Sequence, residues 1–433
     1  MNINEQKLEE RMREIENNIP EKIEISRFQP MTSGKVVEIL GLTIKKDEEN
    51  KLVTFLCGLS TYTESSQFNI SFNAPSSTGK SYIPIEIARL FPKEDVKEIG
   101  YATPTSFFHD VGEFNKERKG YEIDLSRKLL IFLDQPHSML LERLRPLLSH
   151  DEKEMLLKIT DKSQKGGIRT KTVFIKGYPA VIFCSAGLQI DEQESTRFLL
   201  LSPQTSQEKL RQAIHEKIKK ETDSNAYALW LDGDPERKLL KERIEAIRNE
   251  HIEEIKIADP EMIEKIFLNK RAILKPRHQR DIGRLISLVK MFALLNLWFR
   301  DRKDNIIIAN ADDIKEAVQI WDKISESQEY NLPPFVYDLF REVILTAWQD
   351  KNKGNAGDIK VGISRMDIFK KHYEVYGRPI PDWLLRQQII PMLETTGLIN
   401  QEADPNDKRK VLIYPTAQLT VSDDKNNSEL DRG

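Results

Sequence analysis

The chain has 433 residues, of which 39% are hydrophobic and 31% are charged, and its formal net charge at pH 7 is −3. This balance is typical of a globular protein of two or three domains, and the global charge does not predict nucleic-acid binding, although a local basic surface remains possible. No apolar run reaches the roughly 18 residues that a membrane helix needs, no apolar signal core is present, and Cys57 and Cys184 form neither a metal-ligand spacing nor a disulfide framework. We therefore expect a cytoplasmic protein.

The first half of the chain alternates short apolar runs with helical patterns. Continuous apolar runs of this length are typical of strands that are buried on both faces of a parallel sheet, so the sequence predicts an α/β fold. The expected elements are helices over residues 1–25, 48–61 and 80–91, and strands over 68–72, 129–133 and 180–183.

The strand at 68–72 runs directly into the stretch NAPSSTGKSY. Its end matches the G-x-x-x-x-G-K-[ST] pattern of a phosphate-binding loop, with Ala74 in place of the first glycine. Successive backbone amides between a strand end and a helix start can surround the phosphates of ATP, while Lys80 contacts the outer phosphates and Ser81 supplies a hydroxyl to Mg²⁺. The alternative is a serine-rich turn that contains this pattern by chance. The residues predicted to bind the nucleotide are Ala74, Pro75, Ser76, Ser77, Thr78, Gly79, Lys80 and Ser81.

A phosphate loop needs a carboxylate for Mg²⁺ at the end of a neighbouring strand, and Asp134 follows the apolar run at 129–133. The alternative for Asp134 is an ordinary residue at a strand end. Gln135 stands where a glutamate base is usual; it cannot take a proton, but it can position a water molecule by hydrogen bonding. His137 and His150 have no further ligands near them in the sequence, and we expect both to be structural.

A basic hairpin is predicted after a helix at 138–148, with its turn at Gly166 and Gly167. The strand after the hairpin ends at Ser185, and Arg197 stands directly before another apolar run. The cations near the hairpin tip are Lys162, Lys165, Arg169 and Lys171. A solvated polar turn is the alternative interpretation of these cations, and a surface ion pair is the alternative for Arg197.

Residues 205–300 have a helical pattern, and one apolar face runs along 279–299. Beyond Pro333 and Pro334 we expect a helix opened by a capping box of Ser364 and Asp367, a second helix after Pro381, and a hairpin up to residue 415. Helix, helix, hairpin is the order of elements in a winged helix. The residues placed to contact DNA there are Arg386 and Gln387 on the second helix and Lys408, Arg409 and Lys410 in the wing; contact with a protein is the alternative.

In this order of motifs the chain resembles the AAA+ ATPases, and within them the minichromosome-maintenance (MCM) helicases and MCM-like proteins of mobile elements or phages. The segments that carry the resemblance are STRFLLLSP around Arg197 and RHQRDIGRLISLVKMFALL, which is similar to the lid helix of that family. The resemblance implies that Ser185 is a sensor for the γ-phosphate in place of the usual asparagine. It also implies that Arg197 is an arginine finger that reaches a neighbouring subunit's ATP, and that Arg280, or less directly Arg277, is a second phosphate sensor.

From the sequence patterns and the resemblance together we expect an N-terminal helical segment over 1–45, an ATPase core over 46–203, a helical lid over 204–332, a winged-helix domain over 333–416 and a disordered tail over 417–433. The function that follows is an ATP-driven, ring-forming DNA motor, either a replicative helicase or a replication initiator, with DNA, further copies of the chain in a hexamer and other replication proteins as partners. The alternative is a nucleotide-gated module that binds DNA or protein with little or no hydrolysis, or a loader of a partner helicase. Gln135 is the feature that favours this alternative.

Overall fold

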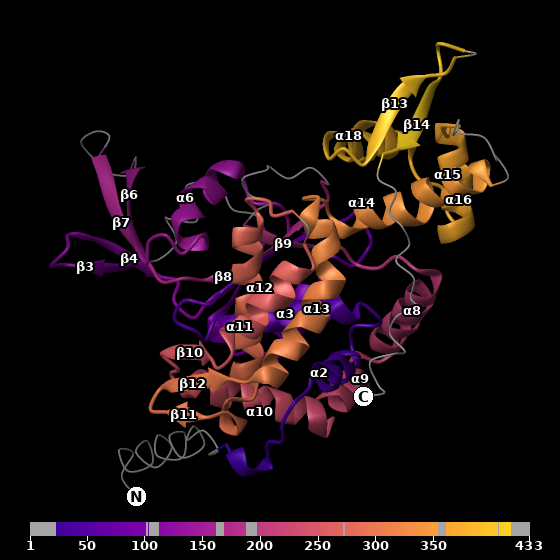
Figure 1. Cartoon of the computed structure of the whole chain (residues 1–433). Coiled ribbons are helices and arrows are strands. Elements are labelled where there is room, and N and C mark those ends of the chain that lie inside the picture. Colours follow the sequence, from indigo (N-terminus) through magenta and orange to yellow (C-terminus); the bar gives the residue numbers. More distant parts are fainter. Residues whose placement is uncertain are drawn as a thin grey trace, which may run out of the picture.

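The computed structural model describes residues 23–416 except 101–102, 104–111, 162–168, 188–196, 272, 354–360 and 406. The helix predicted over 1–25 and the tail predicted over 417–433 therefore lie almost wholly outside the described residues. The predicted α/β class is confirmed, because a five-stranded sheet with parallel pairing occupies the centre of the molecule (Figure 1). Its strands, in spatial order, are β2 (Val96–Ile99), β5 (Leu129–Phe132), β8 (Ala180–Ser185), β1 (Asn69–Asn73) and β9 (Phe198–Leu201).

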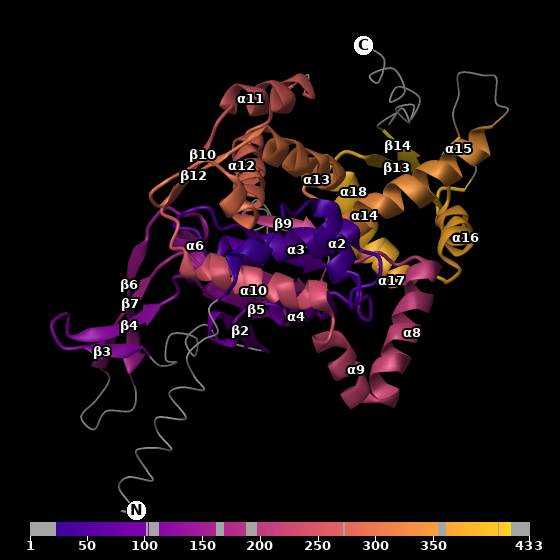
Figure 2. The same ribbon diagram turned by 90° about the horizontal axis from the view of Figure 1, so that it is seen from below.

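The central strands divide their side chains between two apolar cores, as the period of two in a strand requires. On one face, side chains such as Phe72 and Ile182 join a core with α3 (Glu48–Ser60), α4 (Tyr82–Ala88), α12 (His278–Leu295) and α13 (Ala311–Glu329). On the other face, side chains such as Phe183 and Phe198 join a core with α6 (Ser138–Leu148). Helices α3, α12 and α13 pack side by side over the sheet (Figures 1 and 2). The uninterrupted apolar runs in the sequence follow from this burial on both faces.

A second sheet forms an arm that projects from the body (Figure 1). It contains the predicted hairpin, with β6 (Glu154–Asp161) antiparallel to β7 (Arg169–Lys176). The two further strands, β3 (Glu113–Asn115) and β4 (Gly120–Asp124), were not predicted, because they are short and mix charged with apolar residues. The predicted turn at Gly166 and Gly167 lies outside the described residues.

The segment predicted as wholly helical, 205–300, also contains a strand. The small sheet consists of β10 (Glu254–Ile257), β12 (Ile306–Ala309) and β11 (Arg302–Lys303). In β10 the side chain of Ile255 is buried while Glu254 and Lys256 are exposed, so this stretch has the period of a strand. The other helices of this part are α8 (Gln207–Thr222), α9 (Ser224–Asp232), α10 (Pro235–Asn249) and α11 (Pro260–Asn269).

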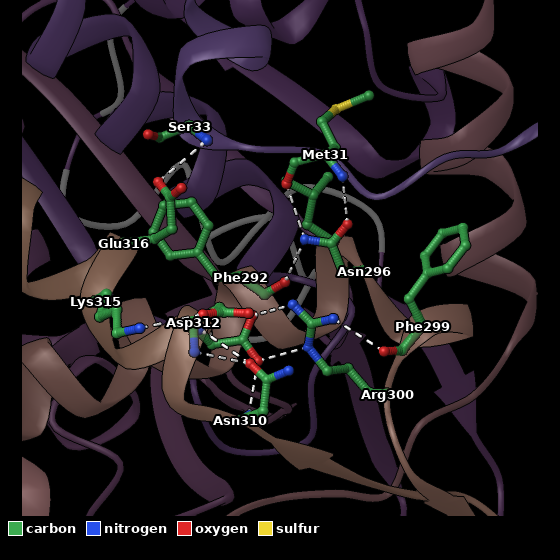
Figure 3. A network of polar contacts seen from close by, with 12 residues as sticks. Met31, Ser33, Phe292, Asn296, Phe299, Arg300, Asn310, Asp312, Lys315 and Glu316 are labelled. Carbon is green, nitrogen blue, oxygen red and sulfur yellow. Dashed lines mark hydrogen bonds and ion pairs between the residues drawn. The ribbon is translucent and has the colours of Figure 1, made fainter.

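The first described residues are attached to the helices that cover the sheet (Figure 3). Asn296, at the end of α12, accepts a hydrogen bond of 2.7 Å from the Met31 amide and donates one of 2.9 Å to the Met31 carbonyl. Glu316 of α13 accepts a hydrogen bond of 3.2 Å from the amide of Ser33, at the start of α2 (Ser33–Leu40). These contacts fix the course of the chain into the loop 41–47, which borders the site described below.

The C-terminal domain has its own apolar core, built from residues between Leu332 and Ile413. One continuous helix runs through α14 (Pro334–Leu339), a π-helical turn (Phe340–Leu345) and α15 (Thr346–Asn352). The predicted capping box of Ser364 and Asp367 opens α16 (Arg365–Tyr376). The second predicted helix follows Pro381 through α17 (Asp382–Leu384), a π-helical turn (Leu385–Ile389) and α18 (Ile390–Thr395), and the predicted hairpin is β13 (Ile399–Ala403) with β14 (Val411–Pro415).

None of the helices in the described part of the chain is both long enough and apolar enough to cross a membrane.

Candidate nucleotide-binding site

The predicted phosphate loop, residues 74–81, connects the end of β1 to α4. Strand β1 lies between β8 and β9, so the loop leaves the sheet where the chain's connections diverge to the two sides. Open α/β sheets bind ligands at the carboxyl ends of their strands at such a point. Two residues of the loop have left-handed backbones, Ser77 with φ 66° and Gly79 with φ 89°. No atom lies within 4 Å of a Cβ built on Gly79, so the glycine is needed for its backbone conformation and not for space.

Lys80 and Ser81 lie in the turn before α4, because the helix begins at Tyr82 and ends at Ala88. The prediction of a helix over 80–91 was therefore too long at both ends. Tyr82 and Ile83 donate their amides to the Gly79 carbonyl at 3.1 and 3.4 Å, which closes the turn. Pro84 falls within the first four residues of the helix, where its missing amide costs no intrahelical bond.

Ser76, Ser77 and Gly79 of the loop are exposed, whereas Ala74 and Thr78 are buried. The Thr78 hydroxyl donates a hydrogen bond of 2.9 Å to the Pro75 carbonyl, which holds the loop from inside. The positions that a phosphate group would approach are therefore the exposed ones, and the buried side chains support them.

Three predicted residues from the ends of two neighbouring strands, β5 and β8, meet beside the loop. The β5–β8 register pairs Phe132 with Phe183, so Asp134 and Gln135 extend to the level of Ser185 at the end of β8. The hydroxyl of Ser185 donates a hydrogen bond of 2.8 Å to Oε1 of Gln135, and Asp134 Oδ1 accepts the Gln135 amide at 2.8 Å. The Ser185 carbonyl accepts the amide of Ala74 at 3.3 Å, which joins this group to the phosphate loop.

Cys184, the residue before Ser185 in β8, contacts the phosphate loop. Its thiol is buried and donates a hydrogen bond of 3.4 Å to the carbonyl of Lys80. Burial raises the pKa of Cys184 to about 12; the charge of Lys80 acts against this rise and that of Asp134 adds to it. The backbone of Lys80 therefore contacts β8 next to Ser185, on the phosphate-loop side of the sheet.

Asp134 and Ser81 provide the oxygen ligands that Mg²⁺ prefers. The Asp134 side chain is exposed and the Ser81 side chain is partly exposed. Among the residues that the structure describes, no three His, Cys, Asp or Glu side chains gather as a metal cluster. This donor set fits a cation that takes a carboxylate, a hydroxyl, phosphate oxygens and water, as Mg²⁺ does with nucleotides. His137 and His150 have structural contacts: the Nδ1 atom of His137 accepts the Met139 amide at 3.2 Å, and the ring of His150 packs on Tyr178 at 4.5 Å.

A cavity of about 710 Å³ adjoins the phosphate loop, and it was not predicted from the sequence. Its walls come from the 43–47 loop, the phosphate loop, the start of α4 and one face of α8. The apolar lining residues are Ile44, Tyr82, Ile83, Leu210 and Ala213, and the cationic ones are Lys45, Lys209, Lys217 and Lys220. Three carboxylates, Asp47, Glu216 and Glu221, also line the cavity, so charged groups of both signs stand among its apolar surfaces next to the loop.

Ion pairs hold α8 over this cavity. Lys209 contacts the fully buried carboxylate of Asp47, and Lys220 pairs at 3.1 Å with Glu86, which is only 2% exposed. Lys45 pairs at 3.1 Å with Glu216 of α8. The paired residues are far apart in the sequence; Lys220 and Glu86, for example, are separated by more than 130 residues. For this reason, no local sequence pattern could have identified the cavity.

Arg197 and Arg280 lie toward the amino ends of the strands, at the end of the sheet opposite the phosphate loop. Phe198 pairs with Asn69, the first residue of β1, whereas the phosphate loop follows Asn73, about 13 Å of strand away. The Arg197 guanidinium donates a hydrogen bond of 2.8 Å to the hydroxyl of Ser149, at the end of α6. The structure therefore does not bring Arg197 together with the chain's own Lys80.

The first turns of α12 reach this end of the sheet. Arg284 donates a hydrogen bond of 2.9 Å to the Phe198 carbonyl and pairs with Asp281 at 3.1 Å; Asp281 also binds Arg277 at 2.9 Å. Burial, with a smaller contribution from the charge of Arg280, lowers the pKa of Arg284 to about 10. Arg280 lies one turn before Arg284 and is exposed. Arg277 thus has a structural partner, and the exposed Arg280 lies on the same side as Arg197.

The residues predicted to contact DNA occupy two separate regions. On the arm, Lys162 and Lys165 lie outside the described residues, as does the side chain of Arg169, and the ammonium of Lys171 sits 3.5 Å from the centre of the Tyr121 ring. In the C-terminal domain the side chains are exposed: Arg386 and Gln387 on the second predicted helix, and Lys408, Arg409 and Lys410 in the hairpin loop. Arg409 and Lys410 share an ion pair with Asp407 at 3.1 and 3.6 Å.

No protein-family model matches the sequence, and no curated protein matches it. Among solved structures, the chain is similar to a protein of Cytophaga hutchinsonii whose assignment as an ATPase is provisional. The two are 14% identical, the match covers 66% of this chain and 84% of that one, and the TM-score is 0.35. A similarity at this TM-score supports no statement about function.

Proposed function

We propose that the chain is an ATPase that binds Mg·ATP in the loop 74–81 and works as a ring-forming DNA motor similar to the MCM-like AAA+ proteins, as a replicative helicase or a replication initiator. The observation that carries the proposal is the meeting of Lys80, Asp134, Gln135 and Ser185 at one edge of the sheet, where the loop leaves β1. Residues at the ends of two strands converge there with a residue of the loop, which a serine-rich turn alone would not require.

In this proposal the backbone amides of the exposed loop residues and Lys80 hold the phosphates, and the adjoining cavity takes the nucleoside. Ser81 and Asp134 would hold Mg²⁺, which when bound neutralises charge on the phosphates. The Ser185 hydroxyl holds the side-chain amide of Gln135 in place through their hydrogen bond. A fixed amide can orient a water molecule toward the γ-phosphate, and this positioning accounts for much of catalysis in phosphoryl transfer.

The position of Arg197 supports action between subunits. A cation near the γ-phosphate stabilises charge in the transition state, yet Arg197 lies at the end of the sheet opposite its own phosphate loop. A head-to-tail contact with a second copy would bring it to another loop, and repeated contacts of that kind close into a ring, with a hexamer as the expected form. DNA would be contacted by the basic arm and by a C-terminal domain that acts as a winged helix, with other replication proteins as further partners.

The direct test is ATP turnover by the full chain with no DNA, with single-stranded DNA and with duplex DNA. We expect Mg-dependent turnover that DNA stimulates and that Lys80→Ala removes. Turnover that neither DNA nor the Lys80→Ala change affects would contradict the proposal.

A second candidate function is an ATP-gated module that binds DNA or protein with little hydrolysis, or that loads a partner helicase. The observation in its favour is Gln135, which has no ionisable group and whose Oε1 atom is engaged by Ser185. ATP binding with no turnover under any DNA condition would support this candidate over the motor.

A further inference from the structure

The segment from the end of β9 to the first residue of α8, residues 202–207, contacts both the nucleotide site and the C-terminal domain. We infer that this segment, the 202–207 connector, couples occupancy of the nucleotide site to the C-terminal domain, with Ser202 as the positioning residue. The inference rests on the proposed function, because it takes loop 74–81 to be the site of nucleotide binding.

Ser202 provides the shortest connection. Its hydroxyl donates a hydrogen bond of 2.6 Å to the carbonyl of Asn73, the last residue before the phosphate loop. The same hydroxyl oxygen accepts the amide of Phe335 at 3.1 Å, in the first turn of the C-terminal domain. Ser202 is 7% exposed and Asn73 is fully buried, so water does not readily replace either bond. One side chain therefore joins the strand that carries the loop to the first helix of the C-terminal domain.

The rest of the connector repeats this double contact. Asp47, which lines the cavity, accepts the Gln204 amide at 2.7 Å and also contacts Lys209, another lining residue. The Gln204 carbonyl accepts Lys209 Nζ at 3.0 Å. Three residues further on, Gln207 donates a hydrogen bond of 2.8 Å to the carbonyl of Tyr376, at the end of α16. The connector thus contacts the C-terminal domain at two points and the nucleotide cavity between them.

A ligand that orders the phosphate loop and the cavity wall changes the free energy of these shared bonds, and the change is transmitted to the C-terminal domain. Coupling of this kind is reciprocal: a ligand of the C-terminal domain, such as duplex DNA, has to change the affinity for nucleotide by the same factor. The connector is therefore a regulatory element of the nucleotide site, distinct from the residues that contact phosphate.

Hydrogen exchange of the full chain with and without a non-hydrolysable ATP analogue and Mg²⁺ tests the inference, with binding measured separately by calorimetry. In the wild type we expect the analogue to slow exchange in peptides covering 333–345 by about fivefold, the equivalent of one hydrogen bond. In Ser202→Ala this effect should disappear while the analogue still binds with a Kd within about threefold of the wild-type value, because Ser202 does not contact phosphate. Ser60→Ala is the matched control, since Ser60 is a buried serine that donates only locally, at 2.6 Å to the Cys57 carbonyl.

Gln207→Ala provides a second test if Ser202→Ala fails to fold, because the hydrogen bond between Gln207 and Tyr376 is exposed. For Gln207→Ala we expect loss of the analogue's effect in peptides covering 372–380. The inference is overturned if the analogue binds but leaves exchange at 333–345 unchanged in the wild type, or changes it equally in Ser202→Ala and the wild type. If calorimetry shows no binding to the wild type, the proposed function fails, and the coupling fails with it.

Discussion

The hydroxyl of Ser185 donates a hydrogen bond of 2.8 Å to Oε1 of Gln135, so the side chain that stands in the usual place of a catalytic glutamate is held by the end of the neighbouring strand. The backbone carbonyl of Ser185 accepts a hydrogen bond of 3.3 Å from the backbone amide of Ala74. Ser185 therefore joins the phosphate loop to Gln135. This arrangement can orient water, but it supplies no base.

We predict that Gln135→Glu increases the rate of ATP turnover. A carboxylate at this position can accept the same hydrogen bond from Ser185 and can also take a proton from water, and general-base catalysis typically contributes 10²–10⁴-fold. We expect kcat to rise by at least about tenfold, measured by phosphate release. Gln135→Ala is the control that removes both the amide and its hydrogen bond, and it should lower kcat. An unchanged or lower kcat in Gln135→Glu would show that the missing base at residue 135 does not limit hydrolysis.

The position of Arg197 predicts complementation between two inactive variants. Lys80→Ala removes the phosphate contact within one subunit, and Arg197→Ala removes the cation given to a neighbour, so each alone should lower turnover by about 100-fold or more. Mixed in equal amounts, the two should recover turnover, because some interfaces then combine an intact loop with an intact arginine. Ser149→Ala is the matched control, since it removes the partner of Arg197 but keeps the cation. A mixture no more active than its components would exclude action between subunits.

The exposed cations of the C-terminal hairpin loop predict salt-dependent DNA binding. Changing Lys408, Arg409 and Lys410 together to Glu should weaken binding to duplex DNA of any sequence. If each contacts phosphate, it should also reduce the slope of log K against log salt by about two to three, measured by fluorescence anisotropy. Lys353→Glu reverses an exposed charge elsewhere in the domain and should have a smaller effect. Equal effects of the two variants would favour general charge over a defined contact surface.

Asp338 predicts a pH-dependent stability. Burial, together with repulsion from Glu342, raises the pKa of this carboxyl to about 6. Because the folded pKa exceeds the unfolded one, the stabilising contribution of the protonated form is present below about pH 4 and is lost as the pH rises through 6. Asp338→Asn should therefore raise the free energy of unfolding at pH 8 by about 1–3 kcal/mol and leave it unchanged near pH 4. Urea unfolding at both pH values measures this; the exposed Asp382→Asn serves as control, and a difference independent of pH would contradict the prediction.

The parts of the site that the sequence predicted are those encoded in local patterns. An apolar run that ends at a glycine-containing turn predicts a strand followed by a phosphate loop, and Asp134 and Ser185 were predicted because each lies at the end of a buried strand. The sequence alone could not show that Gln135 and Ser185 bond to each other, because that contact depends on the β5–β8 register.

The cavity and the connector were missed because their contacts join distant segments. Asp47 meets Gln204 across 157 residues, and Ser202 meets Asn73 across 129. Asp47 and Ser202 are ordinary polar residues in the sequence, and only the packing of α8 and β9 makes them part of the site. The strand at Glu254–Ile257 was missed for another reason: its alternation is short, and it lies among helical patterns.

The most direct test of the account is titration calorimetry of the full chain with a non-hydrolysable ATP analogue and Mg²⁺. We predict saturable heat with a stoichiometry near one per chain in the wild type, and at least about a tenfold weaker affinity in Lys80→Ala, which loses a charge-assisted contact to phosphate. Lys97→Ala, which removes an exposed lysine of β2, should bind like the wild type. Absence of binding heat in a folded wild-type protein, or equal affinity in Lys80→Ala, would contradict the assignment of residues 74–81 as a phosphate-binding loop.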